Sequence, residues 1–177
     1  MPRRWIVLAL VGLSLAHEIG SAQGQAPAPG ACRVTTDVEN AAVARAWHED
    51  VINKRNPAAL REILASTITH HAAGDYPKVM EADGISAMMS DFLTAFPDLH
   101  YTFDQFIAKD NYVVERYTAT GTQHGPLGQL PASGRKATWT GINIFRIECG
   151  RIAEVWSEVD AITRTQQLTG TTPASPR

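Results

Sequence analysis

Two adjacent histidines, His70 and His71, are the side chains of this sequence that could most readily move a proton near neutral pH. A neutral imidazole accepts a proton at pH 7 because its unperturbed pKa is about 6.5. Neighbouring residues of an extended chain point to opposite sides, so only one of the two can face a given cavity. The alternative is that both are solvated or make structural hydrogen bonds. We therefore treat His70 and His71 as candidate catalytic residues.

A metal site is not expected from the spacing of the metal-binding residue types. His48 is followed by Glu49 and Asp50 but does not begin a His-Glu-x-x-His motif, which would place two histidines on one helix face. The chain has two cysteines, too few for a four-cysteine zinc site. His70 and His71 would need a third and a fourth ligand nearby. We therefore predict no metal.

Length and composition indicate one globular domain. The chain has 177 residues, of which 44% are hydrophobic and 19% charged, a mixture that can bury a full core. The formal net charge is -2, and neither sign forms a long run. Nucleic-acid binding requires a concentrated basic patch, so we exclude nucleic acid as the main partner.

The first 26 residues have the pattern of a signal peptide. Arg3 and Arg4 precede an apolar run over residues 5–16, and small residues follow it. The run is too short to span a bilayer, which takes about 20 residues. We predict cleavage near residue 26, a flexible lead-in over residues 27–35, and a secreted or periplasmic protein that is not held in a membrane after cleavage.

Export would change what the two cysteines do. In an oxidising compartment Cys32 can pair with Cys149, and two unpaired thiols are the alternative. We favour the disulfide, which would tie the start of the first helix to a turn near the end of the chain.

The elements that must position these side chains begin with helices. Thr36 and Glu39 have the spacing of a capping box, which predicts a helix over residues 38–53. An Asn-Pro pair predicts a short helix over residues 57–64, and a third helix is expected over residues 85–95.

Strand patterns follow, rich in Val, Tyr and Thr. We predict four strands and then a short helix, over residues 101–108, 112–124, 137–148, 151–159 and 161–168. Helices followed by consecutive antiparallel strands indicate an α+β fold, with the helices packed on one face of a curved sheet around a cavity. The domain is expected over residues 36–169, with a disordered tail over residues 170–177.

Three residues outside the histidines could meet a ligand in that cavity. Trp47 and Met88 lie on predicted helices at positions that suit either a cavity wall or an ordinary core. Arg116 lies in the middle of a predicted strand. It either pairs with an acid across the sheet or binds an anionic ligand.

An ordered set of short motifs resembles the SnoaL-like polyketide cyclases, or ester cyclases, of the NTF2-like superfamily. The resemblance covers about residues 36–169 and rests on the Phe-Pro-Asp-Leu, Gly-Thr-Gln-His-Gly, Leu-Pro-Ala-Ser-Gly-Arg, Ile-Phe-Arg-Ile and Glu-Val-Trp segments that begin at residues 96, 121, 130, 144 and 154. It implies a cone-shaped barrel, homodimers or homotetramers, a small apolar or polyketide-like ligand, and catalysis without a cofactor. Characterised members close a ring by an intramolecular aldol reaction.

The resemblance also places the family's catalytic groups on this chain. The carboxylate that acts as the base falls on Ser157, the supporting histidine on Asn143, and the histidine of the Gly-Thr-His pattern on Gln123. A serine hydroxyl does not titrate near neutral pH and cannot replace a carboxylate base. A base would then have to come from elsewhere, and the candidates are His70, His71 and Asp160.

Strand alternation predicts an apolar wall around Ser157 and Asn143. Val155 shares the face of Ser157, while Trp139 and Phe145 share the face of Asn143. These five residues join Trp47, Met88, Arg116 and Gln123 as predicted ligand-binding positions. Two functions stay open: a cyclase or isomerase without a cofactor, or a protein that binds a small molecule without transforming it.

Overall fold

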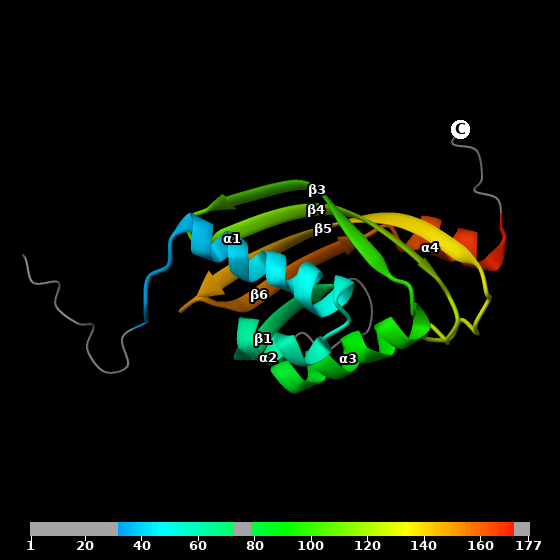
Figure 1. Ribbon diagram of the computed structural model, residues 1–177, viewed down its shortest axis with the longest axis horizontal. Helices are drawn as coiled ribbons and strands as arrows, with labels where there is room; N and C mark the ends of the chain where they lie inside the picture. The colour runs from blue at the N-terminus through cyan, green and yellow to red at the C-terminus, as the bar shows by residue number, and fades with distance from the viewer. Residues whose placement is uncertain (1–31, 73–78, 172–177) are drawn as a thin grey trace, which may run out of the picture.

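The computed structural model describes residues 32–72 and 79–171, and Figure 1 shows their arrangement. The predicted signal peptide lies outside these residues, as does most of the predicted tail. Across the described part of the chain, no helix combines the length and the apolar character needed to cross a membrane.

The helices begin close to where the sequence predicts them. Helix α1 (Asp37–Ala46) continues without a break into a π-helix (Trp47–Asn53), and a 3₁₀ turn (Pro57–Ala59) leads into α2 (Leu60–Ile63). Helix α3 (Ala82–Ala95) and helix α4 (Ala161–Thr169) are each longer than predicted, by three residues and by one. The capping box at the start of α1 is confirmed, because Thr36 and Glu39 each bond the other's backbone N–H.

One curved sheet of six strands faces the helices, and it is not closed into a barrel. The strands are β1 (Leu64–Ala72), β2 (Val79–Glu81), β3 (His100–Lys109), β4 (Tyr112–Thr122), β5 (Lys136–Glu148) and β6 (Arg151–Val159). Their order is β2-β1-β6-β5-β4-β3. All neighbours are antiparallel except β1 and β6, which are parallel. The α+β prediction is confirmed, with helices on one face of the sheet.

Strands β1 and β2 correct the sequence-based expectation. The second helix was expected to run through Leu64, but that residue begins β1 and pairs with Ile152 of β6. In β1 only Leu64 and Ile68 are buried and apolar, so its alternation is weak in the sequence. The parallel pairing with β6 joins segments far apart in the chain, which local patterns do not reveal.

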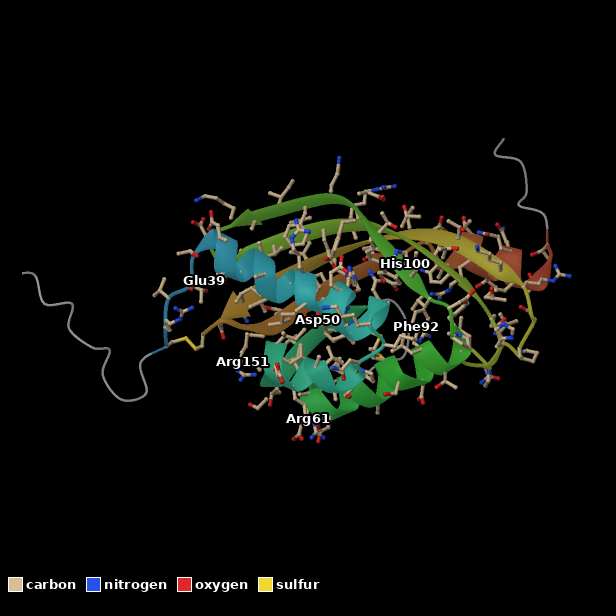
Figure 2. All side chains as sticks on the ribbon, in the orientation of Figure 1. Glu39, Asp50, Arg61, Phe92, His100 and Arg151 are labelled. Carbon is tan, nitrogen blue, oxygen red and sulfur yellow. A yellow bond between two sulfur atoms is a disulfide. The ribbon has the colours of Figure 1, made fainter. Side chains whose placement is uncertain are left out.

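The helices cover the concave side of the sheet and leave space above it. Helix α1 packs on β3, β4 and β6, α3 packs on β1, and α4 packs on β5 (Figure 1). Figure 2 shows Phe92 of α3 pointing toward the sheet, where its ring meets Trp139 of β5. This arrangement puts inward-facing side chains of β1, β4, β5 and β6 opposite α3 and the π-helix.

The disulfide between Cys32 and Cys149 is present, with the two Cα atoms 4.9 Å apart. Figure 2 shows it at the end of the molecule where the segment before α1 meets the turn between β5 and β6. The pairing confirms the prediction and fixes the start of α1 to the sheet.

Candidate functional site

A cavity of about 590 Å³ lies between the concave face of the sheet and the helices. Its walls are mostly apolar, which is the usual character of a small-molecule site. The side chains that line it come from every layer of the fold: Trp47, His48, Ile52, His70, Met88, Met89, Asp91, Phe92, Tyr101, Tyr117, Pro126, Leu127, Asn143, Ser157, Val159, Ala161 and Arg164.

Three polar residues form a straight row across the sheet, and two of them, Asn143 and Ser157, line the cavity. Glu115 of β4 is paired directly with Asn143 of β5, and Asn143 is paired with Ser157 of β6. Ser157 Oγ donates to Asn143 Oδ1 at 2.7 Å, and Asn143 Nδ2 donates to Glu115 Oε1 at 2.9 Å. The row thus connects the position of the family's carboxylate to a different carboxylate two strands away.

His48 completes the row from the helical side. Its Nε2 lies 3.2 Å from Glu115 Oε1, and both side chains are fully buried. The imidazole is held among aromatic rings, with centroids 4.6 Å from Tyr101, 5.0 Å from Tyr117 and 5.5 Å from Phe103. The wider π-helical turn buries both Trp47 and His48, although they are consecutive residues. π-Helical turns of this kind are frequent at functional sites.

Nε2 of His48 lies beside two groups, Glu115 Oε1 at 3.2 Å and Asn143 Nδ2 at 3.5 Å. The tautomer with its proton on Nε2 would turn a donor toward the carboxylate oxygen, which can accept. Nδ1 is buried with no hydrogen-bond partner in the described structure. The ring of His48 thus has one nitrogen beside a carboxylate and one without a partner, an arrangement also found in histidines that transfer protons.

Two tyrosines stand beside this base. The rings of Tyr101 and Tyr117 stack, with centroids 4.5 Å apart. Burial raises the pKa of Tyr117 to about 12 and raises the pKa of Tyr101 well above its ordinary value. Both hydroxyls therefore keep their protons at physiological pH, and because the two side chains share a hydrogen bond, one donor is left over.

His70 and His71 face opposite sides of the sheet, as alternation along β1 requires. His70 lines the cavity, and its pKa is lowered by burial and then by the nearby His71. His71 lies on the outer face, where its Nε2 is 2.7 Å from Glu154 Oε1 and its ring stacks on Trp156. Of the two histidines, the structure brings only His70 into the cavity.

The other predicted site residues divide into those that reach the cavity and those that do not. Trp47, Met88, Asn143 and Ser157 line it. Trp139, Phe145 and Val155 share the predicted face but are packed in the core, outside the cavity lining. The predicted register is confirmed, because Asn143 and Ser157 are direct partners and both face inward.

The structure places three further predicted positions outside the cavity lining. Asp160 lies outside the cavity lining because it caps α4, accepting from the N–H of Thr163 at 3.0 Å. Arg116 pairs with Asp104 across the sheet, which is the structural alternative to an anion site. Gln123 is fully buried outside the cavity lining, and its amide points toward backbone carbonyls of the loop between β4 and β5.

Sequence reasoning missed His48 and Glu115 as functional residues. Glu115 alternates with Val113, Tyr117 and Ala119, so a single acid stands on the apolar side of β4. An acid on the apolar side of a strand could have indicated a functional position in the sequence. His48 was weighed only as a metal ligand. Among the described residues, no group of three or more His, Cys, Asp or Glu is placed to hold a metal ion.

The chain belongs to the SnoaL-like polyketide cyclase family, whose model matches residues 42–168. Solved structures with the same fold include IdmH, a candidate polyketide cyclase from Streptomyces antibioticus, at 26% identity and a TM-score of 0.63, covering 73% of this chain and 98% of that one. TsrD from Streptomyces laurentii is 25% identical with a TM-score of 0.68, over 78% and 99% of the two chains.

A third structure, a candidate SnoaL-like polyketide cyclase from Jannaschia, has a TM-score of 0.70 at 16% identity, over 80% and 98% of the chains. At that identity the likeness concerns the fold alone. No curated protein matches the sequence.

Proposed function

We propose that this protein is a cofactor-independent acid–base enzyme that removes a proton next to a carbonyl group of a mostly apolar, polyketide-like molecule. Ring closure or isomerisation of that molecule would follow. The observation that carries the proposal is the fully buried His48–Glu115 pair, of which His48 lines the cavity and Glu115 lies behind it. A buried ionisable pair in a cavity points to chemistry more than to stability, because the cost of desolvation offsets its attraction.

In the proposed reaction His48 carries its proton on Nε2, toward Glu115, and Nδ1 is the base. A C–H bond next to the carbonyl breaks, its proton goes to Nδ1 of His48, and the electron pair moves onto the carbonyl oxygen as an enolate. Glu115 stabilises the imidazolium that forms, while Asn143 holds Glu115 in place. If the enolate carbon attacks a second carbonyl of the same molecule, His48 returns the proton to the resulting alkoxide and the ring is closed.

In this proposal the carboxylate has moved within the site. The family's base falls on Ser157 of β6, but Glu115 of β4 lies in the same row of paired residues. Glu115 does not replace the lost base directly. It orients His48, which takes over the proton transfer.

A protein that binds without catalysis is the second candidate. It is favoured by Ser157, whose hydroxyl donates to Asn143 and so cannot serve as a base on β6. Export to an oxidising compartment and assembly into homodimers or homotetramers remain part of the proposal for either function. The Cys32–Cys149 disulfide is consistent with export.

The direct test is exchange of deuterium from solvent into the activated C–H position of β-keto esters, followed by NMR. We expect exchange catalysed by the wild type and a loss of about 10²–10⁴-fold in the His48→Gln variant, the usual contribution of one general base. His71→Gln is the matched control, because it alters a histidine on the outer face, and it should keep the wild-type rate. Binding of the esters without exchange would favour the non-catalytic candidate.

A further inference from the structure

We propose that the cavity binds its ligand as an oxyanion, with an enolate or phenolate oxygen at the hydroxyls of Tyr117 and Tyr101 and the guanidinium of Arg164 balancing the charge. The ligand class is therefore an acidic enol, a 1,3-dicarbonyl compound or a phenol. This proposal rests on the proposed function for the location of the ligand, and it assigns the oxygen-binding end of the same site.

The tyrosine hydroxyls are suited to donate to an anion. Tyr101 and Tyr117 are 8% and 3% exposed, and both line the cavity. Burial is the main cause that raises the pKa of each, and the hydrogen bond between the two side chains raises the pKa of Tyr101 but lowers the pKa of Tyr117. Two stacked, protonated phenols that share a hydrogen bond leave a donor available for a ligand oxygen, and a donor in a dry site is worth more than in water.

The hydroxyl of Tyr117 lies directly over the backbone of β5, at a position where β5 has a glycine. Tyr117 is paired with Gly141, and a Cβ atom at Gly141 would lie 2.3 Å from Tyr117 Oη. Any other residue at position 141 would displace the hydroxyl. The absence of a side chain there is what lets Tyr117 lie across the neighbouring strand at the cavity.

Arg164 supplies a positive charge close to the same hydroxyls. It reaches the cavity from α4, with its guanidinium carbon 5.3 Å from the ring centroid of Trp139 and 5.8 Å from that of Phe92. Its charge lowers the pKa of Tyr101 and of Tyr117, whereas burial and the charge of Glu115 raise the pKa of both, and at Tyr117 the effect of Glu115 exceeds that of Arg164. A group that stabilises a negative oxygen at the tyrosines would stabilise a ligand oxyanion bound to them in the same way.

The charges of the cavity are distributed so that proton transfer creates no isolated charge. The transfer makes an imidazolium at His48, beside the negative Glu115, and an enolate at the tyrosines, near the positive Arg164. The remaining ionisable side chains of the lining are His70, whose pKa is lowered by burial, and Asp91, which is exposed on α3. Glu115 also opposes a negative oxygen at the two tyrosines, and the imidazolium that forms at His48 offsets that charge.

The test uses 4-nitrophenol, a planar phenol that titrates near neutral pH and changes colour when it ionises. Binding to the full chain is measured across pH by absorbance, so that the affinities of phenol and phenolate are obtained separately. We expect the phenolate to bind at least about tenfold more tightly, which equals a downward shift of about one unit in the pKa of the bound probe.

Variants separate the groups that hold the anion. Tyr117→Phe and Arg164→Met should each remove most of the preference for phenolate, and Tyr101→Phe should reduce it. Tyr112→Phe is the matched control, because Tyr112 lies on the same strand but is exposed on the outer face, and it should bind like the wild type.

Each other outcome overturns the proposal. No binding of the probe, equal affinity for both forms, tighter binding of the neutral phenol, or an unchanged preference in Tyr117→Phe would each do so. His48→Gln distinguishes this proposal from the proposed function: it should lose deuterium exchange yet keep the preference for phenolate. A wild type that prefers phenolate without catalysing exchange would reject the proposed function alone.

Discussion

The described part of the protein places a histidine–glutamate pair on each face of its sheet. On the inner face, His48 Nε2 lies 3.2 Å from Glu115 Oε1, and neither side chain is exposed. On the outer face, His71 Nε2 lies 2.7 Å from Glu154 Oε1, with the side chains 28% and 18% exposed. The outer pair has the shorter contact, but our proposal assigns the chemistry to the inner pair, because His48 lines the cavity.

The difference lies in what surrounds each pair. Glu154 also accepts from Arg146 Nε at 2.7 Å, and His71 is covered by the ring of Trp156, so the outer pair belongs to a surface network. Solvated pairs of this kind contribute about 0–1 kcal/mol. The inner pair has no neighbouring cation among its hydrogen-bond partners, and an imidazole nitrogen and a carboxylate oxygen have no partner. Both atoms are buried, and in our proposal the imidazole nitrogen is the one that meets the substrate.

The largest effect is expected from breaking the inner pair. His48→Ala leaves the Glu115 carboxylate buried with only Asn143 as a donor, which should lower the free energy of unfolding by about 3–5 kcal/mol. His71→Ala should lower it by less than about 1 kcal/mol. Urea unfolding at pH 7 measures both. Equal losses in the two variants would show that burial does not separate the pairs.

A double replacement separates stability from chemistry in the inner pair. Leucine at both positions 48 and 115 removes the two ionisable groups together, and replacing a buried pair by apolar residues is often neutral or stabilising. This variant should recover most of the stability lost in His48→Ala while its deuterium exchange stays at the background rate.

The next largest effect is expected from adding a second carboxylate to the row formed by Glu115, Asn143 and Ser157. In Ser157→Asp the new carboxylate can only accept, so Asn143 would have to turn its NH₂ group away from Glu115. Glu115 would lose a donor and face a second acid, which raises the pKa of one of the two. We expect a loss of about 1–3 kcal/mol at pH 8. The loss should shrink as the pH falls, because the raised carboxyl then binds its proton in the folded state.

Glu115→Gln combined with Ser157→Asp provides the control for that variant. It returns the only carboxylate of the row to β6, and Asn143 can donate to Asp at 157 while its oxygen accepts from Gln at 115. The double variant should be more stable than Ser157→Asp alone, and it tests whether β6 can again supply the base in the exchange assay. Additive losses would mean that the row does not act as a connected unit.

Much of the fold could be predicted because its signals are local. The capping box at Thr36 and the turn at Cys149 and Gly150 mark the ends of elements in a few residues each. Strand β1 could not be predicted in the same way, because it is stabilised by parallel pairing with β6, about 85 residues later in the chain.

Of the candidate site, the sequence could predict the residues on the strands but not the residue on the helix. Alternation and the family resemblance located Asn143 and Ser157 as neighbours in the cavity. The partner of that row, His48, comes from a helix, and its inward position depends on the π-helical turn at Trp47–Asn53. A 3.6-residue period does not describe such a turn, so the helical pattern gave no reason to bring His48 and Glu115 together.

The smallest effect concerns the pH dependence of the outer pair. Hydrogen bonds from Arg146, and then from His71, lower the pKa of Glu154 below its ordinary value. A carboxyl with a lowered pKa stabilises the folded state at pH values above its unfolded pKa of about 4.3, and this stabilisation is lost as the pH falls through the folded pKa. Glu154→Gln should therefore be less stable than the wild type at pH 6–7, by less than about 1 kcal/mol, since the group is near the surface. Urea unfolding of both proteins should show the difference narrowing below about pH 4. A difference that stays constant down to pH 3 would mean that Glu154 contributes through packing and that its charge has no net effect.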